Sequence, residues 1–186
     1  MRHLFSANAA LLTVAGLSFA LADAAEPPAP PPSVVVSDAA ALVAAVRDQP
    51  QGAIIRIAAG EYRLEAPLEP KAGQTIEGAG IDETIITHAE SWNPSTSTLP
   101  DPETRTQGMD TRAYLIRLQD KAANITISNL TLRAPQLHGA IYGWENQGLR
   151  VHHVRVHQTR WCGIRTFGLK QGRIHDCQFT DAGGRW

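Results

Sequence analysis

The chain has 186 residues, of which 19% are charged, with a formal net charge of −1 and a pI near 6.6. This length suits one domain or part of one. Because basic residues are not in excess, the composition excludes a protein that binds nucleic acid through a broad positive surface. No long block of like charge predicts a disordered charged tail.

The N-terminus has the pattern of an export signal. Met1-Arg2-His3 gives a positive start, residues 9–22 form an apolar run, and Ala22-Asp23-Ala24 offers small residues for cleavage. The run is too short to span a bilayer. We therefore predict a signal peptide over 1–24, a secreted or periplasmic protein, and no membrane span after signal removal. The alternative is a buried helix of the mature protein. Prolines make 25–33 a spacer.

The next segments change from helical to strand periodicity. Residues 37–48 predict a short helix with Ser37 as N-cap and with Leu42, Val43 and Val46 on one apolar face. Short apolar strands punctuated by glycine are expected in 53–68 and 74–90. The polar stretch 91–112 has no apolar periodicity, and a loop of this length is usually functional or disordered. Strand patterning resumes at residue 113.

The C-terminal half contains a repeat. Ile127, Val151 and Ile174 align at steps of 24 and 23 residues, and each begins the same alternation of apolar and polar positions. A second strand also recurs, as GAIYGW (139–144) and GIRTFG (163–168), and YLIRLQ (114–119) fits one repeat earlier. Alternation of this kind puts one face of each strand in the core and the other in solvent.

A two-residue break interrupts each repeat at the same place. The breaks are Ser128-Asn129, His152-His153 and His175-Asp176. Asn, His and Asp are the residues other than glycine that most often adopt positive φ, which bends a strand sharply. A bend repeated in register coils the chain, and the coils stack at the spacing of paired strands, about 4.8 Å. The pattern predicts an all-β, parallel β-helix over 34–186, with a short N-terminal capping α-helix; the resemblance given below implies that it is right-handed. Because the chain stops within a repeat, we expect the domain to be incomplete at its C-terminus.

The segments ITISNLTL (125–132), GAIYGW, GIRTFG and RIHDC (173–177), and the entry after the helix, resemble the right-handed parallel β-helix superfamily typified by pectate and pectin lyases. The resemblance covers roughly 34–186. It implies a polysaccharide bound along the outer face of the strand that precedes the corner strand. The fold hosts many activities, so the resemblance is more specific for architecture than for chemistry.

The outward residues on that strand are Arg117, Tyr142 and Arg165, each following an inward isoleucine in successive repeats. Guanidinium groups bind sugar carboxylates, and aromatic rings offer an apolar face to a sugar. The resemblance implies Arg165 as catalytic base and Arg117 and Tyr142 as substrate-binding residues, and we add Trp144 to the binding set. The alternative is a solvated strand face with incidental arginines.

No cofactor or metal is expected. The calcium-dependent lyases that the chain resembles carry a run of Asp on this face, whereas Glu145, Asp176 and Asp181 are scattered here. His152 and His175 lie one repeat apart; stacked corner residues are favoured over zinc ligands because no third ligand has suitable spacing. Cys162 and Cys177 could form a disulfide, but the alignment favours Cys177 as a small core residue.

Together these features predict an exported, monomeric protein that acts on a uronate-containing acidic polysaccharide by β-elimination. Two alternatives remain open at this point. One is a noncatalytic carbohydrate-binding or cell-surface β-helix protein, and the other is a glycoside hydrolase or epimerase on the same fold. Paired acids for glycoside hydrolysis are not evident in the sequence.

Overall fold

The structure is a computed structural model that describes residues 29–92, 94 and 112–182. The predicted signal peptide, the first part of the predicted spacer and most of the polar stretch 91–112 lie outside the described residues. Among the residues that are described, no helix is long and apolar enough to cross a membrane.

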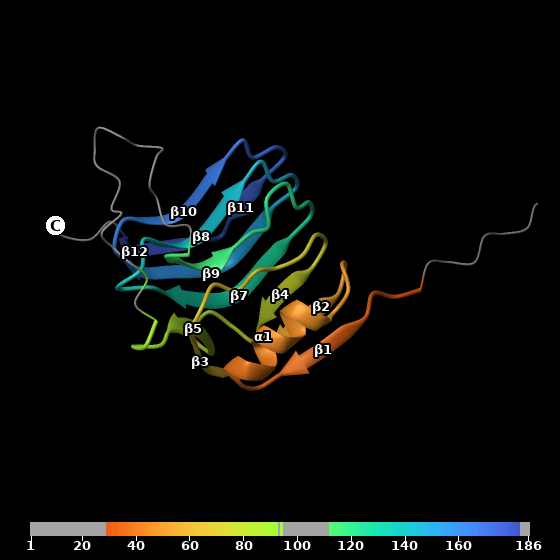
Figure 1. The fold of residues 1–186 in the computed structure, drawn as a ribbon, viewed down its shortest axis with the longest axis horizontal. Coiled ribbons are helices and arrows are strands. Elements are labelled where there is room, and N and C mark those ends of the chain that lie inside the picture. Colours follow the sequence, from red (N-terminus) through yellow and green to blue (C-terminus); the bar gives the residue numbers. More distant parts are fainter. Residues whose placement is uncertain (1–28, 93, 95–111, 183–186) are drawn as a thin grey trace, which may run out of the picture.

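One helix and a series of short parallel strands make up the domain (Figure 1). Helix α1 spans Ala39–Asp48. Sheet A contains β1 (Ser33–Val36), β2 (Ile54–Ile57), β3 (Gly60–Leu64), β4 (Thr75–Gly78), β5 (Thr84–His88), β7 (Thr126–Arg133), β9 (Arg150–Thr159), β11 (Arg173–His175) and β12 (Gln178–Ala182). Sheet B contains β6 (Tyr114–Arg117), β8 (Gly139–Trp144) and β10 (Cys162–Phe167).

The predicted right-handed parallel β-helix with a short N-terminal helix is confirmed, and the chain makes about six turns. All strand pairs are parallel, and one apolar column runs through the whole stack. Its members, each paired with the next, are Val34, Ile55, Ile76, Ile127, Val151 and Ile174. No single coil can bury its apolar face alone, so this stacking supplies the core.

The predicted corners are also confirmed. Asn129, His153 and Asp176 have φ of 56°, 52° and 52°. Positive φ recurs at other turns that the sequence analysis missed, where successive repeats place Asn124, Gly148 and Gln171 at 58°, 67° and 53°. From residue 121 onward the chain therefore bends at several stacked corners in each coil, and only one set was recognised from sequence.

The start of the domain differs from the prediction in two ways. Strand β1 begins at Ser33, the last residue of the predicted spacer. The N-cap of α1 is Asp38 rather than Ser37: the Asp38 carboxylate accepts a hydrogen bond of 2.8 Å from the Ala41 amide. Both residue types cap helices well, and an ionised side chain near a helix N-terminus adds favourable charge.

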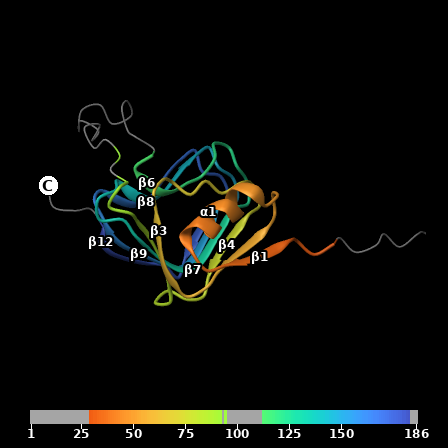
Figure 2. The ribbon, with the colours of Figure 1, turned by 60° about the horizontal axis from the view of Figure 1, so that its bottom comes forward.

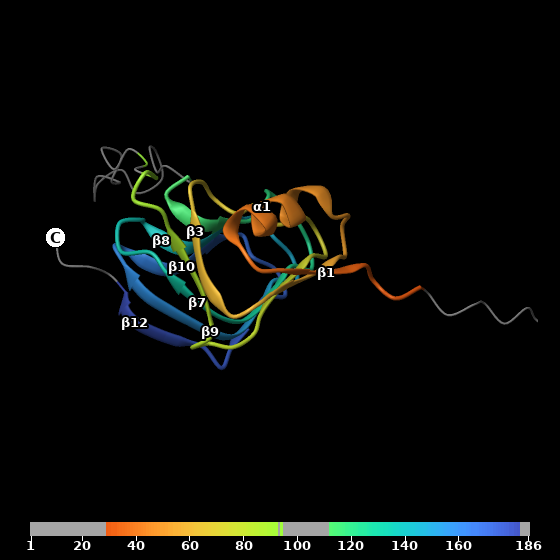
Figure 3. The ribbon, with the colours of Figure 1, turned by 90° about the horizontal axis from the view of Figure 1, so that it is seen from below.

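Helix α1 lies across the N-terminal end of the coil (Figures 2 and 3). Leu42, Ala45 and Val46 are buried against the first coils. Val43, which was predicted to share this buried face, is 41% exposed instead. The buried stripe is thus narrower than the helical periodicity indicated, because a helix that covers one end of a coil contacts it along one edge only.

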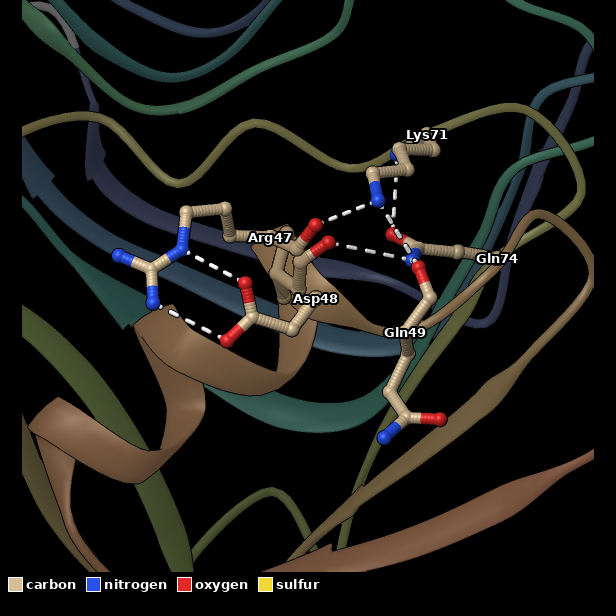
Figure 4. Close-up of polar contacts among 6 residues, drawn as sticks. Arg47, Asp48, Gln49, Lys71 and Gln74 are labelled. Carbon is tan, nitrogen blue, oxygen red and sulfur yellow. Dashed lines mark hydrogen bonds and ion pairs between the residues drawn. The ribbon is translucent and has the colours of Figure 1, made fainter.

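Two side chains from the turn before β4 hold the C-terminal end of α1 (Figure 4). The Lys71 ammonium donates to the carbonyl oxygens of Arg47 and Gln49, the latter at 3.0 Å. The Gln74 amide nitrogen donates to the carbonyl oxygens of Val46, Gln49 and Pro50 at 3.2–3.3 Å. These bonds satisfy carbonyl groups that a helix end leaves without partners, and they tie the cap to the coil.

At the other end, the last described coil leaves Ile174 and Phe179 exposed by 44% and 49%. The expectation of a domain that is incomplete at its C-terminus stays a prediction.

Candidate functional site

The outer face of sheet B carries the predicted site residues. Arg117 on β6 pairs with Tyr142 on β8, which pairs with Arg165 on β10. These residues therefore form one column across three successive coils, about 4.8 Å apart from strand to strand. Ile116, Ile141 and Ile164 form the matching inward column.

Tyr142 does not offer the open ring face that the sequence suggested. Its side chain is only 6% exposed, because its ring lies 5.3 Å from that of Tyr114 and 6.3 Å from that of Phe167, centroid to centroid. Burial raises the pKa of the Tyr142 phenol above its ordinary value. Gly139 explains why Tyr114 fits beside it: a Cβ at Gly139 would lie 2.6 Å from the Tyr114 ring.

Trp144 is the open aromatic surface of this face. It is 41% exposed, and its ring packs 5.3 Å from that of Phe167, its partner on β10. The two rings are tilted by 44° to each other. Trp144 therefore presents the exposed aromatic surface that was expected of Tyr142.

The guanidinium of Arg165 lies over two aromatic rings. Its Cζ is 4.2 Å from the centroid of Trp161 and 4.8 Å from that of Phe167. Such contacts attract a cation to the ring face and hold the side chain in place. The sequence analysis did not include Trp161 in the site; its position in the turn just before β10 was the only available signal.

Arg117 is held from the preceding coil. Its Nη1 donates to the Glu69 carboxylate at 2.9 Å, and Leu68 beside Glu69 forms a parallel bridge with Ile116. Its Nε is buried and has no hydrogen-bond partner among the described residues. A buried N–H without a partner costs free energy, so the ion pair with Glu69 holds Arg117 at some expense.

Beneath the column lies a polar pair within the wall of the coil. The Tyr114 hydroxyl lies 3.6 Å from the Cys162 sulfur, and burial raises the pKa of both groups above their ordinary values. Cys162 and Cys177 are both free thiols, so the possible disulfide is not formed. Cys177 packs partly buried against the core, as the repeat alignment predicted.

Three of the histidines, His152, His153 and His175, lie on sheet A, away from this face. The rings of His152 and His175 stack at 5.2 Å with an interplanar angle of 8°, which confirms the predicted stacked arrangement. His153 meets both rings edge on. Within residues 29–92, 94 and 112–182, no group of three or more His, Cys, Asp or Glu side chains is arranged to hold a metal ion.

Comparison with known proteins locates the fold but no close relative. No protein-family model matches the sequence, and no curated protein matches it. Among solved structures, an alginate lyase from Paenibacillus sp. strain FPU-7 matches with a TM-score of 0.57 and 13% identity, over 78% of this chain and 43% of that protein. A mutant of AlyGC, an alginate lyase of the PL6 family, matches with a TM-score of 0.58 and 14% identity, over 87% of this chain and 22% of that protein.

The chain thus spans less than half the length of either alginate lyase. At these identities the likeness concerns the backbone arrangement alone. The chain has the parallel β-helix fold that these polysaccharide lyases share.

Proposed function

We propose that this protein acts on a uronate-containing polysaccharide by β-elimination, as an exported monomer. The observation that carries the proposal is the column of Arg117, Tyr142 and Arg165 on sheet B. Arg117 and Arg165 stand on the first and third strands of sheet B, whose backbones are about 10 Å apart along the coil axis. A polymer with a carboxylate on every sugar, lying along that axis, can contact both.

In this proposal Arg165 and Arg117 have different roles. Arg165 removes the proton beside the uronate carboxylate, the electron pair forms a carbon–carbon double bond, and the glycosidic oxygen leaves with a proton from solvent. Arg117, whose side chain is partly exposed beside Glu69, binds and positions the carboxylate in the ground and transition states alike. Trp144 supports a neighbouring sugar ring, and Tyr142 lies between the two arginines in the column. The resemblance to pectate lyases and the fold shared with alginate lyases support this assignment.

The test is the absorbance of unsaturated product released from alginate or polygalacturonate. We expect Arg165→Ala to abolish turnover while substrate binding falls less, because a base acts only in the transition state. Arg117→Ala should raise KM more than it lowers kcat. The matched control is Arg56→Ala on sheet A, which also breaks an exposed ion pair, at 3.3 Å with Glu77. Equal turnover in all three variants would reject the site.

A noncatalytic carbohydrate-binding protein is the second candidate. It is favoured by the way Arg165 is held over Trp161 and Phe167, because a guanidinium against two ring faces is stabilised as a cation and suits static binding. The same assay separates the two functions. Retained binding of a uronate polymer without any unsaturated product would support the binding protein.

Export is tested separately. N-terminal sequencing of protein recovered from outside the cytoplasm should find a chain that starts near Ala25, as the cleavage pattern predicts. Recovery of a chain that still begins with Met1 would reject the signal assignment.

A further inference from the structure

A second charged surface lies on the outer face of sheet A. A groove of about 380 Å³ runs across β5, β7, β9 and β12, and its polar lining comprises Asp82, Thr131, Arg133, Arg155, His157 and Thr180. Figure 2 places β9 and β12 across the coil from β6 and β8. The groove therefore belongs to a different sheet from the column of Arg117, Tyr142 and Arg165.

Strand register brings three basic side chains together in this groove. Arg133 on β7 pairs with His157 on β9, so they are neighbours on successive coils. Arg155 lies two residues before His157 on the same strand and therefore points to the same face. Arg133 and His157 are therefore separated by the distance between neighbouring strands, and Arg155 and His157 by two residues along one strand.

Neighbouring side chains hold both guanidiniums in place. Arg155 donates from Nε to the Gln178 amide oxygen at 3.0 Å and from Nη1 to the Asp82 carboxylate. Arg133 donates from Nη2 to Glu61 at 3.2 Å. The arginine side chains are only 30% and 34% exposed, so little side-chain entropy remains to be lost when a ligand binds.

Asp82 differs from the groups around it, because its side chain is 78% exposed. An ion pair with so exposed a carboxylate contributes little stability. The carboxylate can therefore swing into solvent and leave the Arg155 donor to another anion. His157 adds a ring nitrogen to the groove lining, 2.9 Å from the Thr180 hydroxyl and 3.8 Å from the Asp181 carboxylate.

We propose that this groove is a second carbohydrate site, which binds a carboxylate group of an acidic polysaccharide in the place of Asp82. Arg155 and Arg133 contact the carboxylate oxygens, and the apolar side chains of Ile81 and Ile85 line the wall beside them. Only the identity of the polymer rests on the proposed function. The groove holds the polysaccharide against sheet A and takes no part in bond cleavage.

The experiment removes the first site and measures binding at the second. The Arg117→Ala/Arg165→Ala double variant is the background protein. Titration calorimetry measures its Kd for saturated uronate tetramers prepared from alginate and from pectate, and for cellotetraose as the neutral counterpart. We expect a uronate tetramer to bind and cellotetraose not to bind. Adding Arg133→Gln and Arg155→Gln should weaken the binding about tenfold or more, which corresponds to the loss of about 1.4 kcal/mol or more. Adding Arg56→Gln and Arg150→Gln, which removes the same charge elsewhere on sheet A, should change Kd less than twofold.

A further variant, expected to lower Kd rather than raise it, distinguishes a direct contact from a merely structural effect. Asp82→Asn removes the competing carboxylate without changing the arginines, so it should tighten binding about threefold. Circular dichroism checks that every variant is folded. Absence of tetramer binding in the background variant, or a Kd unchanged by Arg133→Gln/Arg155→Gln, would overturn this inference. If the wild-type protein forms no unsaturated product but the groove still binds a uronate tetramer, the proposed lyase function is rejected and this inference is not.

Discussion

Gly78 ends β4 and Gly80 follows it two residues later, but the two glycines meet different surroundings, and this contrast allows a sharp test of the packing at the third coil. A methyl group at Gly78 would overlap the carbonyl oxygen of Asn129 and lie 2.8 Å from Cβ of Leu130 and 2.9 Å from Cβ of Thr84. For a methyl group at Gly80 the nearest atoms would be those of the flexible Glu83 side chain, at 3.4–3.5 Å.

We therefore expect Gly78→Ala to be strongly destabilising. Carbon atoms pack best at about 3.5–4.0 Å, so β4 and β7 would have to separate by roughly 0.5–1 Å around a backbone oxygen that cannot rotate away. Overpacking of this kind lowers the free energy of unfolding by about 1–3 kcal/mol, and backbone contact places this site near the upper value. For a chain of this length the loss corresponds to a fall in Tm of about 5–10 °C.

Urea unfolding followed by circular dichroism measures the effect, with Gly80→Ala as the matched control. The control should be neutral or slightly stabilising, because it reduces the freedom of the unfolded chain without a clash. If Gly78→Ala lowered the free energy of unfolding by less than about 0.5 kcal/mol, the close approach of β4 to the Asn129 corner would be wrong.

Three further predictions concern corners, buried amides and pH. Asn129→Val should lower the free energy of unfolding by about 1–2 kcal/mol, because a β-branched residue is strained at the observed φ of 56°. Asn129→Gly should lower it less. Equal losses for the two variants would contradict the corner geometry. Asn146→Ala should lower the free energy of unfolding in urea by about 1–3 kcal/mol, because the Asn146 side-chain amide donates to two carbonyl oxygens inside the coil, at 2.8 and 3.1 Å. An unchanged free energy of unfolding would mean that water replaces the amide. Burial, followed by the neighbouring imidazoles, lowers the pKa of His152, and burial lowers the pKa of His88. The unfolded chain therefore takes up protons at higher pH than the folded chain. We expect the free energy of unfolding to fall as pH drops through about 6.5. His152→Gln should reduce this slope, and an unchanged slope would show that His152 does not contribute.

The repeat explains why so much of the architecture could be predicted. Because parallel coils stack residue on residue, the spacing of Ile127, Val151 and Ile174 specifies strand direction and register at once. The N-cap was placed one residue early because Ser37 and Asp38 are both good caps, and the packing of α1 against the coil decides between them.

The site was less predictable, since alternation tells which way a side chain points but not what covers it. Tyr142 points outward and is nevertheless buried, because Gly139 on its own strand leaves room for the ring of Tyr114. The basic groove on sheet A shows the same limit. Arg133 and His157 continue the repeat spacing, yet the hollow between them and the turn at Ile81 and Asp82 depends on a segment that does not repeat.

The apolar column that runs from Val34 to Ile174 also has a consequence for folding kinetics. Most neighbours in the column are 21 to 24 residues apart, but Ile76 pairs with Ile127 across 51. Closing a loop twice as long costs only about 0.6 kcal/mol of extra chain entropy, so this excursion barely affects equilibrium stability. It does divide the chain into two runs of short-range closures, residues 33–88 and 114–182, each of which can form its own coils early. The pairing of β4 and β5 with β7 then joins the two halves, and we expect that step to limit the folding rate.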